Sequence, residues 1–183
     1  ALNAAEQPAG GLLGGASPVQ KISPEDAVTV AYAVSVTGCG TDPLTEGAAV
    51  LKHSIHGVSV QGNLGGRYDY KMYAIYHPDG EVCAKTLEGL GYELLERNVF
   101  VNVQEIEGDY LRNNIEKNGC CGEKELIKLE AYTLTQHPIV VHLDLDVVVL
   151  KPLDDLFDVM MMSEKKEKDE PLDLTHLPSM WPL

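Results

Sequence analysis

Two carboxylates, Asp144 and Asp146, stand two residues apart at the end of the apolar stretch "IVVHLDLD" (139–146). Side chains of a strand alternate between its faces, so the pair should project to one side and Leu145 to the other. An unpaired carboxylate is costly to bury, so the two acids should reach solvent or hold a cation. Hard oxygen ligands suit Mg²⁺ or Mn²⁺, which keep positions open for substrate phosphates. The placement favours a metal site for a nucleotide-diphosphate substrate over a chance D-x-D in a solvated loop.

Alternating strands and helices must position these acids. Apolar, β-branched runs predict strands at 27–36, 68–77, 92–101 and 139–146, with 147–150 as a further extended piece. Spacing of three to four residues predicts helices at 44–59, 81–91, 108–119 and 123–136, and a short helix at 153–158. This order indicates an α/β fold with a mostly parallel, doubly wound sheet and helices on both faces. In such sheets ligands bind beyond the carboxyl ends of the strands.

The same spacing predicts which helical side chains face the core. The expected inward residues are Ala48, Leu51, Ile55 and Val58 in the first helix, Val82, Leu87 and Leu90 in the second, and Leu126, Leu129, Tyr132 and Thr133 in the fourth. Gly91 and Pro138 should end the helices that precede them.

The chain divides into three parts by composition. Residues 1–24 are rich in Ala, Gly and Pro without a period and are interpreted as a flexible arm. Residues 25–162 carry the α/β pattern. Residues 163–183 contain a charged run and three prolines, and are expected to form a loop or tail.

Composition excludes several classes of function. The 183-residue chain has 28 acidic and 14 basic residues, a formal net charge of -14, which would repel nucleic acids and anionic membranes. No apolar stretch reaches the roughly 20 residues of a transmembrane helix. Four cysteines match neither a disulfide-dense mini-protein nor paired zinc motifs, and the adjacent Cys120 and Cys121 are interpreted as structural rather than as a redox or metal device.

The surroundings of the acids carry a family resemblance. The stretch "KLEAYTLTQHPIVVHLDLDVVVLKPLDDLF" (128–157) resembles the glycogenin-like retaining glycosyltransferases of family eight. Their pattern is a lysine-leucine helix, an aromatic residue, Leu-Thr, a hydrophobic strand, D-x-D and a later leucine-phenylalanine element. The helix around "EGAAVLKHSI" (46–55) resembles the one that follows the family's uridine-binding loop. The resemblance spans roughly residues 27–158 and is specific around the D-x-D.

The resemblance implies a GT-A fold of Rossmann-like type, here ending after the D-x-D strand, with a UDP-sugar donor and Mn²⁺ (or Mg²⁺). Asp146 would be the main metal ligand, with Asp144 shared between metal and ribose, and Lys128 would approach the donor. Ser35, Thr37 and Asp42 would meet the uracil and ribose. The loop "TGCGTD" is longer than the family's, and Leu44 replaces its aromatic residue.

Two hypotheses follow for the whole protein. A later family element, H-x-x-G-x-x-K-P-W, supplies a third metal ligand, and "HLPSMWPL" (176–183) lacks its glycine and lysine. The chain is therefore expected to be the nucleotide-binding half of a longer enzyme, which transfers a hexose to an acceptor hydroxyl with retention. The alternative is a non-catalytic GT-A-like subunit of a larger assembly. The sequence does not identify the acceptor, which could be a glycan or a protein. The sequence begins at Ala1, so a targeting signal can already have been removed, and the compartment could be the secretory pathway, the cytosol or a plastid.

Overall fold

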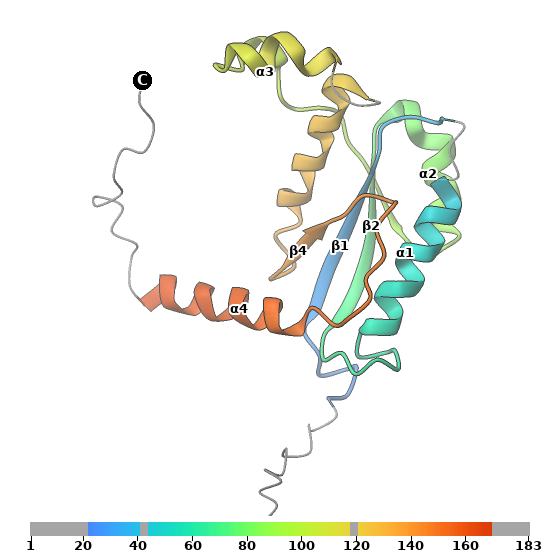
Figure 1. Ribbon diagram of the computed structural model, residues 1–183, viewed down its shortest axis with the longest axis vertical. Coiled ribbons are helices and arrows are strands. Elements are labelled where there is room, and N and C mark those ends of the chain that lie inside the picture. Colours follow the sequence, from blue (N-terminus) through green and yellow to red (C-terminus); the bar gives the residue numbers. More distant parts are fainter. Residues whose placement is uncertain (1–21, 41–43, 118–120, 170–183) are drawn as a thin grey trace, which may run out of the picture.

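A computed structural model describes residues 22–40, 44–117 and 121–169. Within them the chain alternates strands and helices, as the sequence predicts (Figure 1). The elements are β1 (Thr29–Val36), α1 (Leu44–Val58), β2 (Asp69–Tyr76), η1 (Pro78–Gly80), α2 (Glu81–Glu88), β3 (Glu93–Glu96), η2 (Val103–Glu105), α3 (Asp109–Asn114), η3 (Ile115–Lys117), η4 (Gly122–Thr133), β4 (Val140–His142) and α4 (Asp154–Asp169), where η denotes a 3₁₀ helix.

The four strands form one parallel sheet in the order β3-β2-β1-β4. β1 pairs with β2 along its whole length, from Thr29 opposite Asp69 to Val36 opposite Tyr76. On its other side β1 pairs with β4, where Ala33 lies opposite His142. This order is that of the first four strands of a doubly wound sheet, in which the direction of winding reverses between the first and fourth strands. The predicted α/β class is confirmed.

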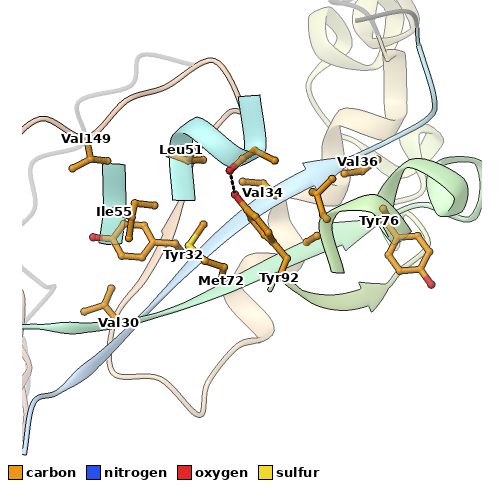
Figure 2. Packing of buried hydrophobic residues seen from close by; sticks show 14 of the residues in the cluster. Val30, Tyr32, Val34, Val36, Leu51, Ile55, Met72, Tyr76, Tyr92 and Val149 are labelled. Atoms are coloured by element: carbon orange, nitrogen blue, oxygen red, sulfur yellow. Dashed lines mark hydrogen bonds between the residues drawn. The ribbon is translucent and has the colours of Figure 1, made fainter. Parts of the chain in front are cut away.

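The larger part of the core lies between the sheet and the two helices α1 and α2, which Figure 1 shows on the same side of the sheet. The four residues predicted to face inward from α1, Ala48, Leu51, Ile55 and Val58, are all buried. Figure 2 shows Leu51 and Ile55 above side chains of β1 and β2, and Tyr92, whose hydroxyl donates a 2.8 Å hydrogen bond to the Ala48 carbonyl. Burial of each such large side chain stabilises the fold by about 1.5–3 kcal/mol.

The second helix matches its prediction only in part. Leu87 is buried and Leu90 packs against the core, but Val82 is 76% exposed and Ala84 takes its inward position. The helix ends at Glu88, and Gly91 follows with φ of +83°, a left-handed conformation that a glycine adopts without strain.

On the other face of the sheet lies η4, which the sequence predicts as an α-helix. Its buried residues are Ile127, Glu130 and Ala131, whereas Tyr132 is 82% exposed and Leu129 also reaches solvent. Together with Leu134 just after η4, these buried residues recur at a spacing of three to four, but they lie about one position further along the chain than the predicted inward residues. The inward prediction was therefore wrong for Leu129, Tyr132 and Thr133, which are exposed, whereas Leu126 is half-buried.

The last strand is shorter than predicted. β4 ends at His142, although the Leu143 amide still donates a 2.9 Å hydrogen bond to the Ala33 carbonyl of β1. The chain then leaves the sheet through a turn that is closed by a 3.3 Å hydrogen bond from Val147 N to the Asp144 carbonyl.

Residues 147–150, which were predicted to continue as an extended piece, do not form a strand in the structure. Among them, Val149 packs into the core beside α1, where its amide donates to Ser54 Oγ at 3.1 Å.

The final helix is longer than predicted. α4 begins at Asp154 and extends to Asp169, past the boundary at 163 where a loop was expected. The stretch "SEKKEKD" (163–169) consists mainly of Glu and Lys, which have high helix propensity and need no apolar period to continue a helix. Phe157 fixes the start of α4, because its buried ring packs edge-on against Tyr32 and Tyr68. Nearly all of the predicted arm (1–24), and 170–183 of the tail, lie outside the described residues.

Among the residues that the structure describes, none of the helices has the length and apolar character needed to cross a membrane.

Candidate functional site

A cavity of about 770 Å³ opens at the carboxyl ends of β1 and β4. This is the point where the winding of the sheet reverses, at which ligands of doubly wound folds bind. The loop after β1, the start of α1, the η4 helix and the turn after β4 together form its walls. The lining residues are Ser35, Val36, Thr37, Gly38, Cys39, Gly40, Leu44, Gly47, Cys121, Lys124, Glu125, Lys128, Asp144, Leu145 and Asp146.

The structure brings the predicted site residues together. Ser35, Thr37, Lys128, Asp144 and Asp146 come from segments up to 111 residues apart in sequence (146 − 35), and all five line this one cavity. The sixth, Asp42, lies outside the described residues. The sequence analysis missed Lys124 and Glu125 of η4, Cys39, and the start of α1 as further walls.

Asp144 and Asp146 occupy the turn after β4 and not the strand itself. Both are exposed at the cavity, so neither pays the cost of burying a bare charge. The strand alternation from which a common direction was predicted does not apply in a turn. What brings both acids to the cavity is the early end of β4 at His142.

Lys128 of η4 reaches across to the first of these acids. Its Nζ lies 3.0 Å from Asp144 Oδ1 and 2.8 Å from Glu125 Oε2. The hydrogen bond to Glu125, and then that to Asp144, raises the pKa of Lys128, so the side chain is an ammonium at neutral pH. The cavity mouth therefore combines a fixed positive charge with exposed carboxylates.

The carboxylates are the available ligands for a divalent cation. The described residues contain no group of three or more His, Cys, Asp or Glu side chains that could enclose a metal ion. Asp144 and Asp146 supply hard oxygen atoms, and Mg²⁺ or Mn²⁺ is commonly held by one or two carboxylates together with substrate phosphates and water. The donor set fits such a cation, and fits a closed structural metal centre poorly.

A polar pair lies beneath the cavity on the η4 face of the sheet. Ser35 Oγ of β1 and His142 Nε2 of β4 are joined by a 2.7 Å hydrogen bond. Burial, and then the charge of Lys128, lowers the pKa of His142, so the imidazole is neutral at pH 7. The bond fixes the Ser35 hydroxyl at the cavity floor. In β4, His142 lies two residues after Val140 and so on the same face of the strand. This alternation could have predicted that the His142 side chain faces η4.

A disulfide and an ion pair link the segments around the cavity. A disulfide joins Cys39 to Cys83 of α2, with Cα atoms 5.7 Å apart. Lys124 of η4 forms an ion pair with Asp79 of η1, which links η4 to the turn after β2. Cys121 is also disulfide-bonded, and its neighbour Cys120 lies outside the described residues. The sequence analysis did not predict the Cys39–Cys83 bond, because only the fold brings residues 44 positions apart into contact.

The first turn of α1 packs directly on the D-x-D turn. A Cβ atom added to Gly47 would lie 2.6 Å from the Leu145 carbonyl oxygen, so only glycine permits this approach. The start of a 15-residue helix at the cavity also contributes backbone dipoles that favour a bound anion.

Comparisons with known proteins give little beyond this geometry. No family model and no curated protein matches the chain. Thirty-three chains of solved structures do match. One is the crystal structure of mouse xyloside xylosyltransferase 1 in its apo form, with a TM-score of 0.44 and 15% identity over 74% of this chain and 49% of that chain. The present chain spans about half the length of that structure, and a likeness this distant carries no argument about activity.

Proposed function

We propose that this chain binds a UDP-sugar and a divalent cation in the cavity at β1 and β4, as the donor-binding part of a retaining GT-A glycosyltransferase. The observation that carries the proposal is the meeting of Asp144, Asp146 and Lys128 at one edge of a cavity of about 770 Å³ at the reversal point of the sheet. A pyrophosphate linked to a nucleoside needs a cavity of this size and cationic groups at one end of it. The resemblance of residues 128–157 to family-eight glycosyltransferases rests on the same residues and supports this proposal.

Each wall of the cavity has a task in this proposal. Asp146 and Asp144 would hold Mn²⁺ or Mg²⁺, and Lys128 would contribute a further positive charge for the diphosphate. The Ser35 hydroxyl and Thr37 face the base and ribose. When bound, the divalent cation would neutralise the charge that develops on the leaving diphosphate. The reaction would transfer a hexose to an acceptor hydroxyl.

The donor half of this proposal can be tested by calorimetric titration of UDP into the protein, with Mn²⁺ or with a chelator. We expect UDP to bind with Mn²⁺ and to bind at least about tenfold more weakly without it. Asp146→Asn should abolish the Mn²⁺-dependent part of binding and leave the fold intact, because Asp146 is an exposed turn residue.

Asp26→Asn is the matched control. It makes the same chemical change at an exposed turn before β1, at the opposite end of the strand from the cavity, and it should bind UDP like the parent. UDP binding that is indifferent to Mn²⁺, or an Asp146→Asn variant with the parent's affinity in Mn²⁺, would contradict the proposal.

A further inference from the structure

Lys128 and the proposed divalent cation compete for the same carboxylate, that of Asp144. Asp144 is a proposed ligand of the divalent cation, yet in the structure its Oδ1 atom lies 3.0 Å from the Lys128 ammonium. The side chain of Asp144 is 62% exposed and that of Lys128 is 36% exposed, so both can change partners without opening the core. The ammonium thus occupies a position next to which the divalent cation would have to bind.

Electrostatics opposes the presence of both cations at once. A divalent ion on Asp144 would lie within a few ångströms of Lys128, and charges of the same sign at such separations repel appreciably even near a protein surface. Glu125, at 2.8 Å from the ammonium, keeps Lys128 in place beside the cavity. The described residues contain no group of three or more ligating side chains, so the protein supplies few metal–ligand bonds to offset this repulsion.

A nucleoside diphosphate changes the balance. Its oxygen atoms provide negative charge for both cations and can accept hydrogen bonds from the ammonium. The lysine side chain has a flexible four-carbon stem, so its ammonium group can move by several ångströms while the helix stays in place. The diphosphate can therefore draw Lys128 away and leave Asp144 free.

We propose that Lys128 makes metal binding conditional on the nucleotide: it occupies Asp144 and opposes the divalent cation until a diphosphate takes over the ammonium. This inference rests on the proposed function and adds an order of assembly to it. Because coupling between two ligands is reciprocal, Mn²⁺ must strengthen UDP binding by the same factor by which UDP strengthens Mn²⁺ binding.

The test is the affinity of the protein for Mn²⁺ alone, measured from the electron paramagnetic resonance signal of the free ion, and then repeated with saturating UDP. Lys128→Met removes the charge and keeps a similar side-chain length. We expect this variant to bind Mn²⁺ alone about threefold more tightly than the parent, the scale of an exposed ion pair. The factor by which UDP enhances Mn²⁺ binding should fall. If Lys128 only supported the structure of the site, Lys128→Met would lower the affinity for both Mn²⁺ and UDP and could not raise either.

Lys124→Met is the matched control on the same helix. Lys124 also lines the cavity, but its ammonium pairs with Asp79 and not with a D-x-D acid. Its gain in Mn²⁺ affinity should be smaller than that of Lys128→Met. An equal gain in the two variants, or no gain in Lys128→Met, would overturn the coupling while leaving Mn²⁺-dependent UDP binding in place. Absence of UDP binding by the parent in Mn²⁺ would instead overturn both this inference and the proposed function.

Discussion

Replacing Gly47 by alanine tests whether α1 supports the D-x-D turn. The new methyl group would lie 2.6 Å from the Leu145 carbonyl oxygen, a distance at which backbone must move. Overpacking of this kind costs about 1–3 kcal/mol, whereas Gly→Ala inside a helix gains up to about 1 kcal/mol. The net expectation for Gly47→Ala is a loss of about 0–2 kcal/mol in the free energy of unfolding.

Gly57→Ala provides the comparison within the same helix. The nearest atom to its new methyl group is Leu64 Cδ1 at 3.7 Å, an ordinary contact. This variant should gain about 0.5–1 kcal/mol. Urea unfolding followed by circular dichroism should therefore separate the two variants by about 2 kcal/mol. Gly47→Ala should also weaken Mn²⁺-dependent UDP binding, since the turn that carries Asp144 and Asp146 is displaced. Equal stabilisation by both substitutions would refute the close packing of α1 on the turn.

Two further perturbations test the fold around the site. The double variant Cys39→Ser/Cys83→Ser removes a cross-link over 44 residues, and in the chain-entropy description this lowers the free energy of unfolding by about 4 kcal/mol. Urea unfolding should show this loss, and a double variant as stable as the parent would argue against the bond. The Tyr68 hydroxyl, and then Arg67, lowers the pKa of Asp158 below its ordinary 3.8, so its contribution to stability is present above about pH 4 and is lost as the pH falls further. Asp158→Asn should thus flatten the acid side of a melting-temperature profile, and an unchanged slope would contradict this pairing.

The sequence predicted best where burial follows a regular period. The apolar positions of α1 from Ala48 to Val58 recur as an α-helix requires, and all four proved buried. The period failed to identify the inward face of η4, which is displaced by about one residue from the predicted face, so that Ile127 faces the sheet and Tyr132 faces solvent. It also failed at α4, because a run of Glu and Lys has helix propensity without a period.

The candidate site was predictable in position and not in its connections. Ligands of doubly wound sheets bind beyond the carboxyl ends of the strands, so the strand pattern placed Asp144 and Asp146 at the binding edge, whereas Ser35 was predicted from the family resemblance. The partner of Cys39, the hydrogen bond between Ser35 and His142, and the contact of Gly47 with the turn depend on distances between elements, which one sequence does not encode locally. The early end of β4 likewise places the acids in a turn, where strand alternation has no meaning.

The position of a bound Mn²⁺ ion tests the central claim most directly. Crystals of the chain grown with UDP and Mn²⁺ should give one anomalous peak at the manganese edge beside Asp144 and Asp146, with nucleotide density in the cavity between β1 and η4. A peak elsewhere, or nucleotide bound away from this cavity, would contradict the assignment of the site.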